Sequence, residues 1–215
     1  MFMAVSPQAG DVPPAANTVS LRPELAVHGL NDPRRTEVEA FIFSVFAQRY
    51  GAKIQHFAPV LVSLQDGGEI VAAAGYRSAA YAPLFLERYL PSPVEALLAS
   101  EARAHRLCRS SVVEVGNLAA SRVGEGRRLI ALMGPHLAAQ GFQWVVCTIT
   151  AELRHLFVRL GVTPLALGTA DPAALGPDAA RWGTYYDHRP VVLAGHLGQA
   201  LRHLALRAGD AKAAP

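Results

Sequence analysis

The chain has 215 residues, of which 51% are hydrophobic and 17% are charged, and its formal net charge is +3. This composition is globular and excludes a disordered chain, and the length suits one domain better than two. No apolar run approaches the roughly 18–20 residues of a membrane-spanning helix.

The two ends of the chain are expected to lie outside the folded domain. Met1–Ser20 has no basic n-region, and acidic and proline residues interrupt its apolar stretches, so it is predicted to be a disordered tail and not a signal peptide. We expect a single domain over residues 21–208 and a flexible end over 209–215. The two cysteines have no metal or redox spacing, which favours a reduced, cytoplasmic protein.

The first half of the chain predicts a helix, a hairpin and a second helix. Apolar residues recur at helical spacing between Asp32 and Tyr50. Pro59–Leu64 and Glu69–Tyr76 are rich in β-formers, and the Asp66-Gly67 pair between them is a strong turn signal. After two prolines, Val94–Arg106 is expected to be helical.

The second half alternates strands and helices. The predicted elements, in order, are strand Ser111–Leu118, helix Arg127–Gln140, strand Phe142–Thr150, helix Ala151–Leu160, strands Val162–Leu167 and Pro190–Leu193, and helix Gln199–Arg207. Such alternation predicts an α/β fold with parallel strands at its centre, and the preceding hairpin makes the sheet mixed. This order fits the acetyltransferase architecture better than a doubly wound nucleotide-binding fold.

A glycine-containing loop joins a predicted strand to a predicted helix. In Ser121–Arg127, Gly124 and Gly126 let backbone amides approach an anion, and the positive end of the helix dipole lies at the same place. Arg122 and Arg127 can add charge-assisted hydrogen bonds. The spacing resembles the acetyltransferase pyrophosphate loop, with Ser121 in the place of Gln or Arg. This departure suits a donor with one phosphate, such as a carrier-protein pantetheine. Ordinary turn glycines are the alternative.

Basic residues cluster at two places, Arg103–Arg109 and Arg122–Arg128. Such clusters suit a phosphate-bearing ligand or an acidic carrier protein, and a solvated basic face is the alternative. No aromatic residue is interleaved with these charges, which disfavours single-stranded nucleic acid.

The strand before the glycine loop carries an acid and an amide. Acyl transfer to an amine needs a base for the ammonium proton and donors for the oxyanion. Glu114 is the candidate base, and backbone amides near Val115 or Asn117 are candidate donors. The alternative role of Glu114 is a buried salt bridge with Arg77. Asn117 points to the opposite face unless a bulge intervenes.

Further acids and aromatics are candidates for binding the acceptor. Glu87 and Glu95 could converge on an amino group, or have surface and capping roles. Phe157 stands where many acetyltransferases have a tyrosine general acid, so either the acid comes from elsewhere or the thiol leaves as thiolate and needs none. Tyr185 and Tyr186 are possible substitutes, or core residues. The eight histidines show no metal-ligand spacing, so we expect no metal. The chain has no Gly-x-Ser-x-Gly elbow, which disfavours a serine hydrolase.

Several motifs resemble the thermostable hemolysin family over roughly Arg35 to Gly195. They are Phe57-x-Pro59-x-Leu61, Gly75-Tyr76-Arg77, Leu84-Phe85-Leu86-Glu87-x-Tyr89-Leu90, Val113-Glu114-Val115-Gly116-Asn117-Leu118-Ala119 and Trp182-Gly183-x-Tyr185-Tyr186. The resemblance implies a fold like that of the GCN5-related N-acetyltransferases (GNAT). The family name implies lysis of red cells, whereas the fold implies acyl transfer.

A more distant resemblance is to acyl-homoserine-lactone synthases, which use an acyl carrier protein and S-adenosylmethionine. It implies that Glu114 is the base and that Arg77 organises the acceptor site. In those synthases the motif Glu-x-Ser-Arg-Phe stands where this chain has Glu114–Leu118. Its Ser-Arg pair is replaced here by Gly116-Asn117, so the sequence leaves the acceptor open. Val115, Leu118 and the glycine loop are the expected acyl-donor site.

Three functions remain open from the sequence. The first is an acyltransferase that moves an acyl group from coenzyme A or a carrier protein to a small amine or amino acid. The second is a membrane-active hemolysin that uses the basic, Leu/Ala-rich segment His196–Arg207. The third is a non-catalytic protein that binds an acyl carrier. Acyl length and oligomeric state, monomer or dimer, are open.

Overall fold

A computed structural model of the chain describes residues 24–101, 107–159 and 164–213. Its strands form one seven-stranded sheet in the order β1-β2-β3-β4-β5-β7-β6. The strands are β1 Glu24–His28, β2 Val60–Asp66, β3 Glu69–Ser78, β4 Val112–Ala120, β5 Trp144–Ile149, β6 Leu165–Thr169 and β7 Val191–His196. Only β4 and β5 pair in parallel, so the predicted mixed sheet is confirmed.

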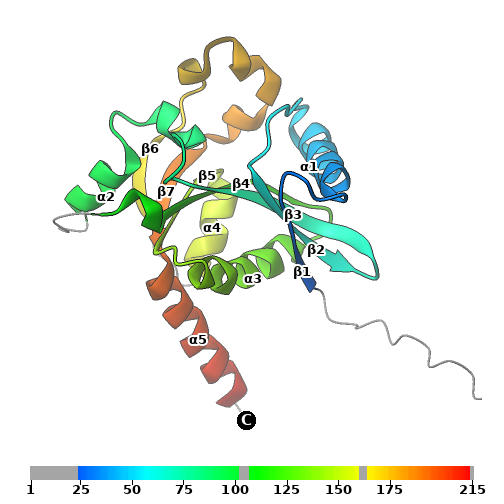
Figure 1. Cartoon of the computed structure of the whole chain (residues 1–215), viewed down its shortest axis with the longest axis vertical. Coiled ribbons are helices and arrows are strands. Elements are labelled where there is room, and N and C mark those ends of the chain that lie inside the picture. The colour runs from blue at the N-terminus through cyan, green and yellow to red at the C-terminus, as the bar shows by residue number, and fades with distance from the viewer. Residues whose placement is uncertain (1–23, 102–106, 160–163, 214–215) are drawn as a thin grey trace, which may run out of the picture.

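The helices lie on both faces of this sheet. They are α1 Arg35–Tyr50, α2 Val94–Glu101, α3 Glu125–Ala139, α4 Ala151–Arg159 and α5 Leu197–Ala213, with 3-10 helices η1 Phe85–Tyr89, η2 Arg109–Ser111, η3 Pro172–Trp182 and η4 Tyr185–His188. Figure 1 shows α1 and the η3–η4 segment on one side of the sheet and α3 and α5 on the other. This arrangement leaves the central strands covered on both faces.

Alternating residues of the strands divide the core between the two layers. On β2, Leu61 packs in the cluster with α1, whereas Val62 packs in the cluster with α3 and α5. A third cluster joins η1 and α2 to β5 and β7 through Leu86 and Val146, among others. Successive side chains of a strand therefore point into opposite helical layers, because side chains alternate between the two faces of a sheet.

The predicted elements agree with the structure in kind and order, with differences at their ends. β1 was not predicted, and the stretch after Gly168, expected to be a loop, contains η3 and η4. The helix predicted over Val94–Arg106 ends at Glu101 within the described residues, since 102–106 lie outside them. α5 continues to Ala213, so residues 209–213 of the expected flexible end are helical, and the predicted tail 1–20 lies outside the described residues.

No helix within the described ranges has the length and apolar character needed to cross a membrane.

Candidate active site

A bulge in β4 shapes the centre of the sheet. Gly75 of β3 pairs with Gly116, but Ala73 pairs with Ala119, so two residues of β4 stand opposite one of β3. At the bulge Asn117 has a positive φ of 52°, which asparagine tolerates better than most residues. Its Oδ1 accepts a 3.4 Å hydrogen bond from the Ala58 amide. The bulge therefore changes the direction of the motif that the sequence singled out.

The two parallel strands separate directly before this bulge. Their pairing ends at Val115 and Cys147, after which β5 continues to pair only with β7. A cavity of about 270 Å³ lies at the separation, and it is lined by Val115, Gly116, Asn117 and Leu118 of β4. Because the separation opens the sheet itself, the cavity receives side chains from both helical layers.

The two ends of the cavity differ in chemistry. On the α3 and α5 side the lining is entirely uncharged and mostly aliphatic; we call this the apolar half, with Ile130, Met133, Gly134, Leu137, Val145, Leu193, Leu197, Ala200 and Leu201. On the α1 and η3 side the lining carries aromatic and charged groups; we call this the polar half, with Phe46, Tyr50, Lys53, His56, Arg77, Phe85, Arg88, Tyr89, Glu114, Asp178, Arg181, Trp182 and Tyr185.

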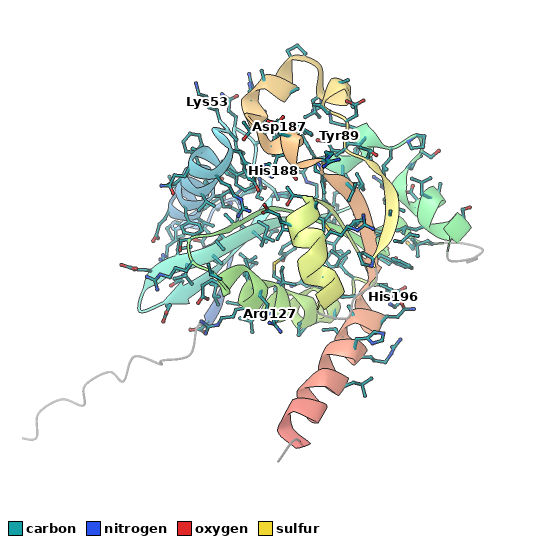
Figure 2. The ribbon with its side chains drawn as sticks, turned by 180° about the vertical axis from the view of Figure 1, so that it is seen from behind. Lys53, Tyr89, Arg127, Asp187, His188 and His196 are labelled. Atoms are coloured by element: carbon teal, nitrogen blue, oxygen red, sulfur yellow. The ribbon has the colours of Figure 1, made fainter. Side chains whose placement is uncertain are left out.

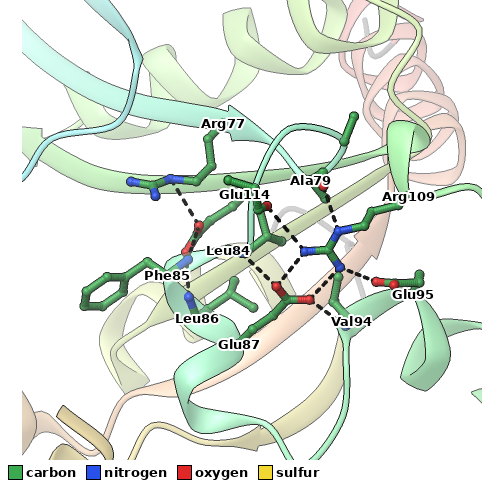
Figure 3. Close-up of polar contacts among 12 residues, drawn as sticks. Arg77, Ala79, Leu84, Phe85, Leu86, Glu87, Val94, Glu95, Arg109 and Glu114 are labelled. Atoms are coloured by element: carbon green, nitrogen blue, oxygen red, sulfur yellow. Dashed lines mark hydrogen bonds and ion pairs between the residues drawn. The ribbon is translucent and has the colours of Figure 1, made fainter.

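Glu114 lies on the polar half, almost fully buried. Its side chain is 9% exposed, and its two oxygens accept hydrogen bonds from the backbone amides of Phe85 (2.8 Å) and Leu86 (3.0 Å). Nε of Arg77 lies 3.4 Å from Oε2 of the same carboxylate. Figure 3 shows these contacts converging on Glu114 from η1 and β3. The salt bridge with Arg77 expected as the alternative role is therefore present, and Glu114 also lines the cavity.

The environment of Glu114 makes it a stronger base than an exposed glutamate. Burial raises the pKa of Glu114, and the Phe85 amide and the Arg77 charge oppose that shift only in part. Each carboxylate oxygen has two lone pairs, so accepting the three contacts above leaves room for one more proton donor. A buried carboxylate with a raised pKa that faces a cavity is a candidate general base.

Glu87 and Glu95 do not reach this cavity. Both carboxylates bind the guanidinium of Arg109, whose Nη2 lies 2.6 Å from Glu87 (Figure 3). Glu87 also accepts hydrogen bonds from the amides of Leu84 and Val94, at 2.7 and 2.9 Å. The two carboxylates therefore connect η1 and α2 to Arg109 of η2. Glu87 and Glu95, which the sequence made candidate acceptor ligands, are not part of the cavity.

The glycine loop precedes α3 as predicted, but it lies away from the cavity. Gly124 has φ 93° and is the N-cap of α3, and no side chain caps the helix. Arg122 pairs with Glu69 at 3.5 Å, whereas Arg127 is exposed. Gly124, Gly126, Arg122 and Arg127 are not among the residues that line the cavity. Figure 2 shows Arg127 on the side of the molecule opposite Lys53 and Tyr89. The first residue of α3 that lines the apolar half is Ile130, three positions after Arg127.

The two candidate tyrosines have different surroundings. Tyr185 lines the cavity, and its hydroxyl donates a 3.3 Å hydrogen bond to the Thr148 carbonyl. Burial raises the pKa of Tyr185. Tyr186 does not line the cavity, and its hydroxyl lies 2.6 Å from that of Tyr89. Phe157, at the position where many acetyltransferases have a tyrosine, also lines the cavity.

Sequence reasoning missed most of the polar half. Phe46 and Tyr50 were read as helix residues, yet they meet Trp182 and Tyr185 at ring-centroid distances of 5.3–6.4 Å. The Trp-Gly-x-Tyr-Tyr motif was the available signal for one wall. Cys147 was read only as a lone cysteine, but it lies beside Val115 at the separation of the strands, where burial raises its pKa to about 12. Among the described residues, no group of three potential ligands could hold a metal ion.

Comparisons with known proteins identify the family and the fold. The family model for thermostable hemolysin matches residues 28–201. No curated protein has a significantly similar sequence.

Several solved structures are similar to this one at low sequence identity. TofI in its apo form is 19% identical, with a TM-score of 0.58 over 85% of this chain and 96% of that one. FeeM, an N-acyl amino acid synthase from uncultured soil microbes, is 14% identical, with a TM-score of 0.58 over 86% and 97%. The coenzyme-A-dependent acyl-homoserine-lactone synthase BjaI is 13% identical, with a TM-score of 0.57 over 87% and 90%. At these identities the likeness shows the fold, and the predicted GNAT-like fold is confirmed.

Proposed function

The chain belongs to the thermostable hemolysin family, and from that premise we propose that it is an acyltransferase. In this proposal it moves an acyl group from a pantetheine thioester, on coenzyme A or a carrier protein, to a small amine. The single observation that carries the proposal is a cavity that crosses the separated strands, apolar at one end and polar with a buried carboxylate at the other. Two substrates of opposite character can meet there.

The donor fits the apolar half. An acyl chain would lie among the aliphatic side chains of α3, β7 and α5, where each buried methylene contributes about 0.8 kcal/mol. The thioester would then lie beside Val115 and Leu118, at the strand separation. The uncapped amides at the start of α3, with Gly124 and Gly126, would bind the phosphate of the pantetheine arm, and exposed Arg127 would supplement them. FeeM and BjaI, which share the fold, are synthases of acylated amino acids and acyl-homoserine lactones.

The acceptor fits the polar half, and Glu114 is the proposed base. It takes a proton from the ammonium group directly or through one water, and the freed amine attacks the thioester carbonyl. A C–N bond forms and the C–S bond breaks, so the products are an amide, a free thiol and one released proton. Backbone amides at the β4 bulge, near Val115 and Asn117, would stabilise the oxyanion. Holding both substrates in one cavity supplies much of the rate through orientation.

Turnover with and without the base tests this function. The protein is incubated with acyl-coenzyme A or acyl-carrier thioesters of several chain lengths and a pool of amines, and products are identified by mass spectrometry. We expect amide formation that falls by about 10²–10⁴-fold in Glu114→Gln. Glu37→Gln, an exposed glutamate on α1 paired with Arg34, is the matched control and should retain full activity.

The pH dependence separates a base from a structural carboxylate. Because the pKa of Glu114 is raised, wild-type kcat/KM should increase with pH until this carboxyl is deprotonated. In Glu114→Gln this rise of kcat/KM with pH should be absent. Saturable thioester binding without any turnover would contradict the proposal, as would lysis of vesicles or red cells that is unchanged in Glu114→Gln and accompanied by no amide.

A further inference from the structure

The polar half of the cavity carries an excess of positive charge. Four basic side chains line it, Lys53, Arg77, Arg88 and Arg181, against two carboxylates, Glu114 and Asp178. Arg88 and Arg181 both lie near Asp178, at 3.9 and 3.5 Å, so this single acid serves two arginines. An acceptor that brings further positive charge would be repelled, whereas one that brings a negative charge would balance the site.

Arg77 has unused hydrogen-bonding capacity within this half. Its side chain is 29% exposed, and within the described part of the chain its only polar side-chain contact joins Nε to Glu114. The two terminal nitrogens extend from that contact away from the carboxylate (Figure 3). A guanidinium with two free terminal nitrogens is suited to binding a carboxylate through paired hydrogen bonds. Since its Nε contacts the proposed base, a carboxylate bound there would lie close to Glu114.

The remaining wall of the polar half is aromatic. Trp182 lies 5.8 Å from Phe85 and 5.3 Å from Tyr185 between ring centroids, and Tyr185 lies 5.3 Å from Tyr50. All four rings line the cavity. Aromatic rings bury a large apolar area, so they favour an apolar or aromatic group over a polar one of the same size.

Resting on the proposed acyl transfer, we propose that the acceptor is an α-amino acid with an uncharged, apolar side chain, whose carboxylate binds Arg77 and whose side chain packs against Phe85, Trp182 and Tyr185. Once Glu114 has removed the ammonium proton, such an acceptor is a mono-anion and complements the excess of basic groups. The same charges disfavour polyamines, which stay cationic. They also disfavour lysine and S-adenosylmethionine, each of which keeps a positive ammonium or sulfonium group and so brings no net negative charge. The acceptor therefore differs from that of a lactone-forming synthase.

A binding measurement tests this without requiring turnover. Trp182 lines the cavity, whereas Trp144, the other tryptophan, packs against His196 at 5.1 Å. Leucine and phenylalanine should change the fluorescence of the Trp144→Phe protein saturably, and their amides should bind at least about tenfold more weakly. The Trp182→Phe protein should give no such signal. Equal affinity for the acids and the amides, or for leucine and spermidine, would overturn the inference.

Steady-state kinetics locate the carboxylate contact. The ratio of kcat/KM for phenylalanine to that for phenylalaninamide is measured in wild type, Arg77→Met and Arg34→Met, with Arg34 chosen because it pairs with Glu37 on the surface. We expect the ratio to fall about 10–100-fold in Arg77→Met alone, and Arg77→Lys to restore it in part. A loss of rate with an unchanged ratio would show that Arg77 only supports Glu114, and would overturn the assignment.

The two proposals fail in different ways. Amide formation that is as fast with polyamines, amino acid amides or S-adenosylmethionine as with apolar amino acids overturns the acceptor assignment and leaves the acyltransferase standing. Selective binding of apolar amino acids with no acyl transfer from any thioester supports the acceptor site and contradicts the transferase.

Discussion

Glu114 and Glu87 are both partly enclosed carboxylates near η1, but their partners differ. Glu114 has one distant arginine contact at 3.4 Å, and burial raises its pKa. For Glu87, burial alone would raise the pKa, but hydrogen bonds from Arg109, Val94 and Leu84 outweigh it and lower the pKa to about 2. A raised pKa is useful in a base, whereas a lowered pKa reports a carboxylate that stabilises the fold.

The Glu87 contacts should therefore contribute to stability in a pH-dependent way. The pKa is about 2 in the folded protein and 4.5 as the ordinary value, so the contribution is complete above about pH 4.5 and lost as pH falls towards 2. We expect Glu87→Gln to lower the free energy of unfolding by about 2–3 kcal/mol at pH 7. Denaturant titrations of both proteins at several pH values measure this difference.

The difference between wild type and Glu87→Gln should shrink between pH 4.5 and pH 2. Glu37→Gln, whose carboxylate is on the surface, should differ little from wild type at any pH. A deficit of Glu87→Gln that is independent of pH would contradict an electrostatic origin.

Sequence reasoning could name these acids but not assign them. The sequence makes Glu114 the candidate base and Glu87 and Glu95 candidate acceptor ligands, but each acid follows apolar residues and nothing local tells a cavity carboxylate from a structural one. What separates them is the position of Arg109, which lies 22 residues from Glu87 along the chain and 2.6 Å away in space. Such long-range pairing depends on the tertiary fold, and a single sequence carries no signal for it.

At the scale of elements, the best predictions rest on local patterns. The hairpin turn, the glycine start of α3 and the continuous apolar run of β5 are each specified by neighbouring residues. β1 was missed because Glu24–His28 is short and carries polar residues at both ends. η3 was not predicted because it contains Pro177 and a Gly176 with non-helical backbone angles, residues that are typical of a loop.

Gly183 joins two distant elements and shows why that segment needs a glycine. Its φ is 53°, and a Cβ at this position would overlap the carbonyl oxygen of Tyr50 at the end of α1. The same carbonyl accepts a 2.8 Å hydrogen bond from the Thr184 amide. The close approach places Trp182 beside α1, which completes the aromatic wall of the polar half.

Replacing Gly183 should therefore disturb both the fold and the acceptor site. We expect Gly183→Ala to cost about 2–4 kcal/mol, since it combines a disfavoured backbone conformation with an overlap. Gly29→Ala is the control, because nothing lies within 4 Å of its Cβ position. Thermal unfolding of the two variants compares them, and a Gly183→Ala protein as stable as Gly29→Ala would contradict the close approach.

At the scale of the whole molecule, the cavity joins the two layers through an opening in the sheet. β4 and β5 part at Val115 and Cys147, so α3 and α5 line one end and α1 and η3 line the other. The sequence predicted the strands other than β1 and the parallel neighbours at the centre of the sheet, but not that the C-terminal helix would line the apolar half. Leu197 and Leu201 of α5 pack with Met133 and Leu137 of α3, which accounts for the first turns of the Leu/Ala-rich segment, whereas Leu206 is exposed.

The volume of the apolar half should set the length of the acyl chain. Ala200→Leu adds bulk to the lining, and we expect the best substrate to become shorter by about two or three methylene groups. Leu201→Ala enlarges the same space, and longer thioesters should gain, by up to about fourfold in kcat/KM per additional methylene. The KM of the amine acceptor should stay unchanged in both variants, because neither residue faces the polar half. Chain-length profiles of kcat/KM over a series of acyl-coenzyme A donors provide the measurement, with thermal unfolding to verify that both variants are folded. Identical profiles in wild type and both variants would place the acyl chain elsewhere.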